Sequence, residues 1–260
     1  MNSTIFSFGS FSIKWYSVLV LLAFIIGYFV SSKLRKKENI PSFFFTDFVF
    51  YLIPIVIIGA RIYYCIFSYK YYIDNPVDVF KIWQGGLAIH GGIIAGIIFL
   101  LYYCKKKDVK ALRLMDCLAP ALIIGQAIGR WGNFFNQEAY GRVVERAFLG
   151  SLHIPDFIID GMYINYRYHH PTFLYESILC LIGFIIILLF YKFLKRQDGQ
   201  VVGLYFIFYG IIRFFIESLR TDSLMFFSFK AAQIVSIIMI VIGIYLFIRF
   251  YISKRFKIIS

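Results

Sequence analysis

The sequence predicts an all-α membrane protein, a bundle of seven transmembrane helices with a small extracytoplasmic cap between the fourth and fifth spans. The chain has 260 residues and is 60% hydrophobic, whereas soluble domains are about half apolar. Its apolar runs reach the roughly 20 residues that a helix needs to cross a bilayer. Charged residues make up only 16% of the chain, and most of them fall between these runs.

Seven apolar runs are the expected spans, and they make residues 1–260 a single polytopic membrane domain. In chain order they cover residues 15–32, 43–67, 87–104, 115–131, 172–194, 201–219 and 231–251. The strong basic cluster follows the first run, which is the reverse of a signal peptide, so we expect a retained span. The longest stretch between runs, residues 136–171, mixes Gly, Pro, Tyr and both charges. We expect it to form the extracytoplasmic cap.

Lysine and arginine residues in the loops predict the orientation. Sixteen of them follow the first, third, fifth and seventh runs, and eight lie in the segments on the opposite side. Because cytoplasmic loops carry the excess of basic residues, we expect the N-terminus outside and the C-terminus in the cytoplasm. The net charge of +13 is spread over short loops and not gathered on one module, which argues against nucleic-acid binding.

Polar residues inside the predicted spans are the candidate functional residues. A charge in the hydrocarbon region costs at least about 2.5–3.5 kcal/mol, so such residues are expected to face the bundle interior. The predicted topology places them at a similar depth, in the outer half of the bilayer, where they can share one cavity. They are Arg61, His90, Arg130, Asn133, Glu138, Glu176, Arg213 and Glu217.

The densest polar group follows the fourth apolar run. It reads Gly129-Arg130-Trp131-Gly132-Asn133-Phe134-Phe135-Asn136-Gln137-Glu138-Ala139-Tyr140-Gly141. The planar guanidinium fork of Arg130 matches a phosphate or carboxylate, which predicts an anionic ligand. In the sixth span, Arg213 and Glu217 share a helical face. They can form a purely structural ion pair, or Arg213 can join Arg130 on one phosphate, and the residues alone leave both possibilities open.

Two further candidates lie near the outer ends of spans. His90 follows Gly85 and Gly86 and precedes Gly91, and these glycines allow close approach of the backbone. A lone histidine is more often a packing residue than a general base, but the arginines at the same depth favour the catalytic role. Tyr16, at the start of the first span, suits an interfacial anchor and can also line the cavity.

These motifs resemble one family, the bacterial phosphatidylglycerol–prolipoprotein diacylglyceryl transferases. The run 129–141 is similar to the signature of this family. Further matches follow in the order of the family and cover most of the chain. They are Trp15-Tyr16, Gly59-Ala60-Arg61, Gly85-Gly86 with His90-Gly91-Gly92, His170-Pro171-Thr172-Phe173-Leu174-Tyr175-Glu176, and Tyr209-Gly210 with Arg213-Phe214 and Glu217.

The resemblance implies the first step of bacterial lipoprotein maturation, at the outer leaflet of the plasma (inner) membrane. The diacylglyceryl group of phosphatidylglycerol would pass to the lipobox cysteine of a preprolipoprotein signal peptide, giving a thioether and glycerol phosphate. Arg130 and Arg213 would bind the phosphate, and His90 would be the general base. The set expected to hold the lipid or orient the arginines is Tyr16, Arg61, Asn133, Asn136, Glu138 and Glu217. No metal or organic cofactor is implied, because the lipid carries its own leaving group.

Three alternatives stay open at this point. A transporter would carry interrupted helices in two related halves, with polar residues through the whole bilayer depth. A non-catalytic protein that binds anionic lipid would lose binding, but no turnover, when Arg130 or His90 is replaced. A different lipid-headgroup transferase is set aside by the resemblance alone.

Overall fold

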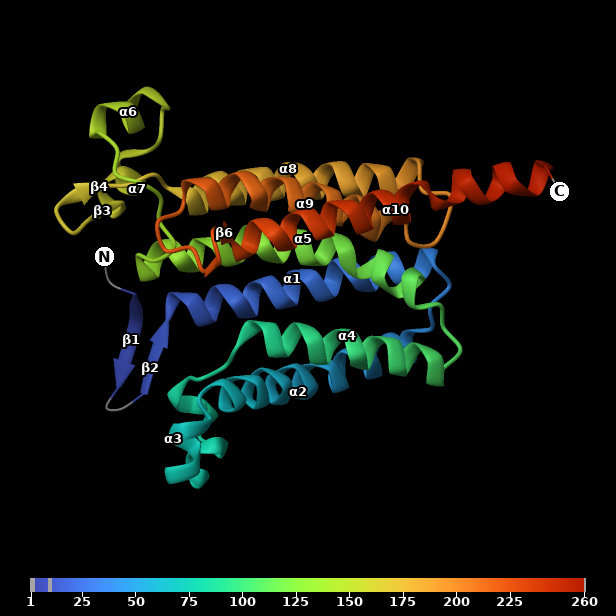
Figure 1. Cartoon of the computed structure of the whole chain (residues 1–260), viewed down its shortest axis with the longest axis horizontal. Coiled ribbons are helices and arrows are strands. Elements are labelled where there is room, and N and C mark those ends of the chain that lie inside the picture. The colour runs from blue at the N-terminus through green and yellow to red at the C-terminus, as the bar shows by residue number, and fades with distance from the viewer. Residues whose placement is uncertain (1–2, 9–10, 260) are drawn as a thin grey trace. The chain divides into compact units, whose positions relative to one another are not determined.

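The computed structural model describes residues 3–8 and 11–259, which are predominantly helical (Figure 1). The chain falls into two compact units. The large unit is formed by Met1–Lys33 and Met115–Ser260, and the small unit is Leu34–Leu114. The grouping of both units into one polytopic membrane domain stays a prediction.

Seven helices in the described part of the chain are long and apolar enough to cross a membrane, which confirms the predicted fold class. They are α1 (Trp15–Lys37), α2 (Ser42–Phe67), α4 (Ile89–Lys106), α5 (Ala111–Asn136), α8 (Thr172–Phe193), α9 (Gln200–Leu219) and α10 (Ala231–Ile259). The candidate span in α10 ends at Arg249. At most 44% of the apolar window of any of these helices is buried inside the protein. The remaining apolar surface faces outward, as lipid contact requires.

Helix α5 extends beyond the predicted end of the fourth span, from residue 131 to Asn136. The extension is favoured because Phe134 is buried and stacks on Phe173 of α8, with ring centroids 4.5 Å apart. The chain leaves the helix at Gln137, whose φ of +50° lies in the left-handed region. Arg130 therefore lies in the last two turns of a helix and not in the loop that follows it.

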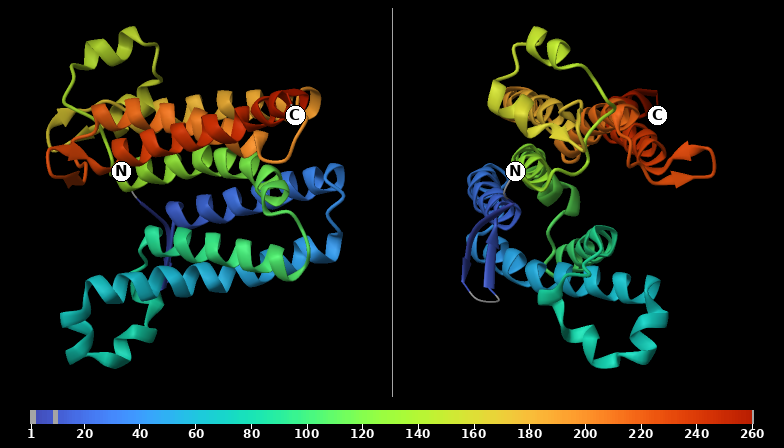
Figure 2. Two further views of the ribbon diagram at one scale, coloured as in Figure 1. Left: turned by 45° about the vertical axis from the view of Figure 1, so that its right-hand side comes forward. Right: turned by 90° about the vertical axis from the view of Figure 1, so that its left-hand side faces the viewer.

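The stretch predicted as a cap contains two short helices and a hairpin. These are α6 (Arg146–Ser151), α7 (Asp156–Gly161), β3 (Tyr163–Ile164) and β4 (Arg167–Tyr168). They lie beyond the ends of α5 and α8 in the large unit (Figure 2). A buried apolar cluster of Phe134, Ile158, Met162 and Phe173 joins the cap to both helices. Two more hairpins complete this unit: β1 (Thr4–Phe8) with β2 (Phe11–Lys14), and β5 (Met225–Phe226) with β6 (Phe229–Lys230).

Polar links join α5 and α9 inside the large unit. The Asp116 carboxylate is fully buried and accepts hydrogen bonds from the backbone N–H groups of Gly199 (2.8 Å) and Val202 (2.9 Å). The same carboxylate lies 3.0 Å from Nζ of Lys195. Asp116 thus satisfies the free N–H groups at the start of α9. Farther along, Gln126 Nε2 donates a hydrogen bond of 2.9 Å to the Tyr205 hydroxyl.

The small unit is built on the antiparallel pair α2 and α4, which lie side by side (Figure 1). The pair approaches closely because glycines face each other: a Cβ added to Gly59 would lie 2.8 Å from the carbonyl oxygen of Gly91. Small residues at a helix contact permit this distance in membranes. The connection between the two helices holds α3 (Tyr69–Asp74) and the 3₁₀ turns η1 (Pro76–Phe80) and η2 (Ile82–Gln84).

Candidate functional site

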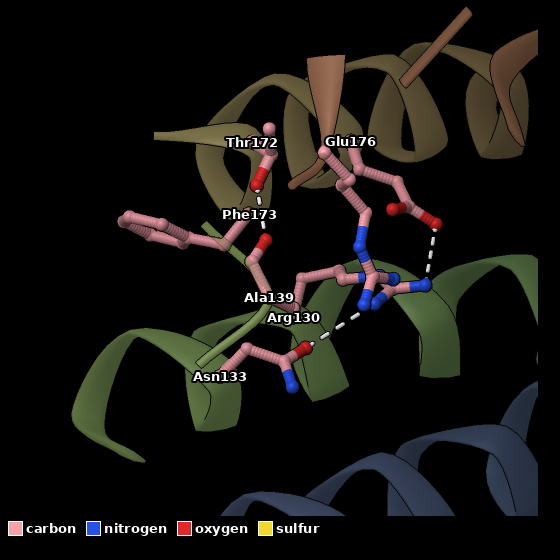
Figure 3. A pocket seen from close by; sticks show the side chains of 7 residues that line it. Arg130, Asn133, Ala139, Thr172, Phe173 and Glu176 are labelled. Carbon is pink, nitrogen blue, oxygen red and sulfur yellow. Dashed lines mark hydrogen bonds and ion pairs between the residues drawn. The ribbon is translucent and has the colours of Figure 1, made fainter. Parts of the chain in front are cut away.

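The centre of the candidate site is Arg130, near the C-terminal end of α5. Its Nη2 atom lies 2.8 Å from Oε1 of Glu176, and its Nη1 atom donates a hydrogen bond of 3.3 Å to Oδ1 of Asn133. Figure 3 shows both interactions converging on the guanidinium group. The first crosses from α5 to α8, and the second stays within one turn of α5. The plane of the arginine fork is thus fixed by two neighbours on two helices.

Glu176 connects two arginines. Oε1 faces Arg130, while Oε2 lies 3.5 Å from Nη1 of Arg213 on α9. The residue is only 1% exposed. A carboxylate buried to this degree is costly unless it is paired, and Glu176 is paired on both of its oxygens. It therefore holds two guanidinium groups, from α5 and α9, at one buried point beside α8.

The charged network continues along the end of α9. Arg213 forms an ion pair with Glu217 one turn later, so the structural pair considered from the sequence exists. Glu217 also faces Arg220, at 3.8 Å, and Arg220 binds Asp222 at 2.9 Å. Lys230 of β6 donates hydrogen bonds to the carbonyls of Glu217 (2.6 Å) and Arg220 (2.9 Å), which caps the end of α9.

Arg213 keeps an unused hydrogen-bond donor. Its Nη1 atom is buried and has no hydrogen-bond partner within the described residues, although the Glu176 carboxylate lies nearby. Leaving such a donor unsatisfied costs about 1–3 kcal/mol, and more for a charged group. A ligand with an anionic oxygen would satisfy it. The structural ion pair and an anion-binding role are therefore compatible in the same side chain.

The amides of the motif act on a third carboxylate. Nδ2 of Asn133 (2.8 Å) and Nδ2 of Asn136 (3.3 Å) both donate to Oε1 of Glu138. The turn that carries Glu138 is held by Thr172, whose hydroxyl donates to the carbonyl oxygen of Ala139. Glu138 is exposed and its second oxygen stays free of these amides. The three residues thus present an oriented acceptor close to Arg130.

These side chains line a shallow pocket in the large unit, too narrow in this structure for a water molecule. Figure 3 shows Arg130 and Glu176 on one side of it and the Thr172–Ala139 contact on another. Its lining residues are Arg130, Asn133, Ala139, Thr172, Phe173, Glu176 and Arg220. The lining combines guanidinium groups, an amide and one aromatic ring. Such a mixture suits a polar headgroup that is attached to an apolar chain.

Tyr16 lies against Gly132, near the end of α5. A Cβ added to Gly132 would lie 2.6 Å from Cδ2 of Tyr16, so the ring covers the helix surface beside Asn133. Next to it, the Trp15 ring stacks on Phe135 with centroids 4.8 Å apart. The start of α1 is thereby held against the end of α5, and Tyr16 is an edge of the candidate site.

Arg61 and His90 belong to the small unit, so their position relative to the arginine cluster stays a prediction. Arg61 is 7% exposed and donates hydrogen bonds to backbone carbonyls of the α2–α4 connection. His90 is exposed in the first turn of α4, with its ring 6.1 Å from that of Tyr63. The structure thus brings Arg130, Arg213 and their partners together in the large unit. Arg61 and His90 lie in the small unit.

Two residues of the site are absent from the roles assigned from sequence. Glu176 was one of the polar residues at the right depth, but it received no role. The sequence does carry a signal for such a role. Glu176 is a lone acid near the start of an apolar span, and two intramembrane arginines need a negative partner. The second is Tyr209 of α9, whose ring stacks on that of Tyr205 with centroids 5.9 Å apart. Its place one turn before Arg213 on α9 was the signal for it.

The cap contributes a histidine whose charge state depends on burial. Burial lowers the pKa of His170 from its ordinary value of 6.5. The unfolded chain therefore binds a proton at a higher pH than the folded one, and stability should fall as the pH drops below about 6.5. We expect His170→Gln to flatten this decline between about pH 7 and pH 5. The thermal unfolding midpoint in detergent, measured across that range, tests it, and an unchanged pH slope would contradict it.

The described residues contain no group of histidine, cysteine or acidic side chains that could hold a metal ion. The fold and the site together define a class of protein: a multi-pass membrane protein with two half-buried arginines that share a buried carboxylate at one end of its helices. Comparison with known proteins narrows this class. A family model described as prolipoprotein diacylglyceryl transferase matches residues 3–249.

Two relatives show how close the similarity is. A phosphatidylglycerol–prolipoprotein diacylglyceryl transferase of Halalkalibacterium halodurans is 51% identical over 234 residues, which cover 90% of this chain and 81% of the relative. A protein of the same name from Staphylococcus aureus strain MSSA476 is 47% identical over 244 residues, which cover 94% and 87%. The chain belongs to the prolipoprotein diacylglyceryl transferase family.

Proposed function

We propose that this chain transfers the diacylglyceryl group of phosphatidylglycerol to the lipobox cysteine of a prolipoprotein. The names of its relatives supply the donor and the acceptor. The observation in the site that supports the proposal is the pair of guanidinium donors, Arg130 and Arg213, held on one buried carboxylate, Glu176. A phosphodiester brings the anionic oxygens that such donors bind.

The proposed chemistry is a displacement at carbon. The cysteine sulfur, as a thiolate, attacks the glyceryl carbon that carries the phosphate ester. A C–S bond forms as the C–O bond breaks, and the electron pair of that bond leaves on the phosphate oxygen of glycerol phosphate. The thiol proton passes to a base. Negative charge grows on the leaving phosphate, and guanidinium groups fixed in a site with little water stabilise it.

The proposed roles are as follows. Arg130 and Arg213 would bind the phosphate, with Glu176 holding the two arginines together and Glu217 orienting Arg213. His90 remains the proposed base, because a neutral imidazole nitrogen can accept the thiol proton. Hydroxyl groups of the headgroup glycerol suit the free oxygen of Glu138 and the amides beside it, Asn133 and Asn136. Tyr16 would close the edge of the site.

The protein is a multi-pass membrane protein, and we propose that it lies in the bacterial plasma membrane with the N-terminus outside and the C-terminus in the cytoplasm. The excess of basic residues in alternate loops supports this orientation. The cap then lies on the outer side, at the same end of the large unit as Arg130. Lipid substrate in the outer leaflet would reach the arginines without crossing the bilayer.

The test is direct transfer in detergent with purified protein. Phosphatidylglycerol labelled in the glyceryl carbons of its diacylglyceryl group is incubated with a lipobox peptide, and in parallel with the same peptide carrying serine in place of cysteine. We expect label on the cysteine peptide only, in a thioether bond that survives mild base treatment. Lipid binding without labelled peptide, by protein shown to be folded, would leave an anionic-lipid-binding protein instead of a transferase.

A further inference from the structure

The Arg61 guanidinium donates its hydrogen bonds to backbone carbonyls of the small unit. Nε donates to the carbonyl of Val79 (2.9 Å), and Nη1 to those of Gly85 (2.8 Å) and Gly86 (2.9 Å). Nη2 donates to the carbonyl of Asp78. A guanidinium group has five N–H bonds, so four of its interactions are already taken by one loop. Arg213, with an unsatisfied nitrogen, is the opposite case.

We propose that Arg61 is a positioning residue that clasps residues 78–86 and thereby fixes the start of α4, where His90 lies. The importance of His90 rests on the function proposed above, whereas the clasp itself does not. The connection from clasp to histidine is short. Gly86 is held by Arg61, and two residues later the N–H of Ala88 donates to the carbonyl of Ala60, at 3.0 Å, in the turn that carries Arg61.

The surroundings stiffen the clasp. The guanidinium carbon of Arg61 lies 5.3 Å from the ring centroid of Tyr72, a cation–π contact. On the loop side, the Asp78 carboxylate pairs with Lys81 and accepts a hydrogen bond of 2.6 Å from the Tyr71 hydroxyl. The hydrogen bond from Lys81, followed by that from Tyr71, lowers the pKa of Asp78, so the carboxylate keeps its charge near neutral pH. Residues 78–86 are thus held by Arg61 on one side and by the contacts of the Asp78 carboxylate on the other.

Glycines allow the α2 segment that carries Arg61 to lie close to the start of α4. Gly59 and Gly91 let α2 and α4 touch, since a Cβ on Gly59 would lie 2.8 Å from the Gly91 carbonyl oxygen. Gly86, with φ of +72°, faces Arg61 and the Tyr64 ring, where a Cβ would lie 2.8 Å from Cε1 of Tyr64. No polar partner of the exposed His90 side chain is found within the described residues, so its position is set by the backbone that Arg61 holds.

This placement argues against a direct role of Arg61 on the lipid. An anion approaching the guanidinium would meet a group already surrounded by carbonyl oxygens, which carry partial negative charge. It would also have to break hydrogen bonds that hold the loop. A ligand role therefore predicts that lysine at position 61 mainly weakens lipid binding. A positioning role predicts that lysine, a point charge without the fork, loosens the loop while lipid binding persists.

The experiment compares Arg61→Lys, Gly86→Ala and Gly85→Ala by amide hydrogen exchange in detergent and by transfer kinetics. The amides to follow are those of Lys81, Gly85, Ala88, Gly91 and Gly92, which all donate hydrogen bonds in this region. The matched control is Gly85→Ala. Gly85 also has a positive φ, +94°, but a Cβ there meets nothing within 4 Å. Both alanine variants place a side chain on a backbone of positive φ, and only Gly86→Ala brings a Cβ against the Arg61 guanidinium.

We expect exchange at these amides to rise at least about tenfold in Arg61→Lys, and more in Gly86→Ala than in Gly85→Ala. In transfer, kcat should fall while KM for phosphatidylglycerol stays within about twofold. Unchanged exchange with a raised KM would overturn the proposal in favour of a lipid ligand. Equal effects of the two alanine variants would also overturn it. Should transfer be absent even in the parent protein, exchange alone still decides on the clasp, and the proposed function is what has failed.

Discussion

Arg130→Ala is expected to lower kcat for diacylglyceryl transfer by about 10²–10³-fold, the loss found when one donor to a developing oxyanion is removed. The guanidinium is fixed by Glu176 at 2.8 Å and Asn133 at 3.3 Å, so it is already placed before any lipid binds. Its removal takes away positive charge where the leaving phosphate gathers negative charge. Labelled transfer to a lipobox peptide, measured over a range of lipid concentrations, gives kcat and KM separately.

Two variants make the result for Arg130 specific. Arg130→Lys keeps the charge but loses the fork, so it should recover only part of the lost rate. Arg146→Ala removes an exposed arginine of α6 that pairs with Asp156 at 3.0 Å, and it should transfer like the parent protein. If Arg130→Ala transfers at the parental rate, Arg130 does not bind the phosphate, whatever the results for Arg130→Lys and Arg146→Ala.

Glu176→Gln is expected to destabilise the fold by about 3–5 kcal/mol, the usual cost of removing one partner of a buried ion pair. The change leaves Arg130 and Arg213 near each other, with only Glu217, beside Arg213, to offset their charges. Their repulsion acts across α5, α8 and α9, at a point where water cannot screen it. The unfolding midpoint in detergent should drop sharply, and transfer should drop with it, because the two arginines move apart.

The control for Glu176 is Asp222→Asn, which makes the same charge change in the same network. The Asp222 side chain is 50% exposed and pairs with Arg220, so its loss should cost less than about 1 kcal/mol. A midpoint in Glu176→Gln no lower than that in Asp222→Asn would show that the buried carboxylate does not hold the arginines together.

Hydropathy and residue type were enough to predict the seven transmembrane helices of this protein. The seven spans follow from the lengths of the apolar runs, because the bilayer imposes a minimum length that soluble helices need not meet. The convergence of Arg130 and Arg213 followed from topology, because a buried cation needs polar company. The end of α5 could not be placed in the same way. It depends on Phe134 finding Phe173 in another helix, a contact that periodicity does not reveal.

Side-chain partners set a second limit to prediction. The sequence groups Arg61 with the other intramembrane arginines, since all three have the same cost in lipid. Its actual partners are carbonyl oxygens, which every residue possesses, so no residue type in the sequence marks them. Glu176 is the reverse case: its chemistry was visible, but only the geometry shows that one carboxylate serves two arginines. The catalytic roles of His90 and the lipid-binding set stay predictions.

The contact of Asp116 with the start of α9 is one of several links that fix α5 and α9 relative to each other. Helices α5 and α9 run in the same direction and are cross-linked at three heights: by Asp116 with Val202, by Gln126 with Tyr205, and by Arg130 through Glu176 to Arg213. A slip of one turn, about 5.4 Å, would break every rung of this ladder at once. The two arginines are therefore fixed at one relative height, so sliding of α5 along α9 is a costly way to open the site.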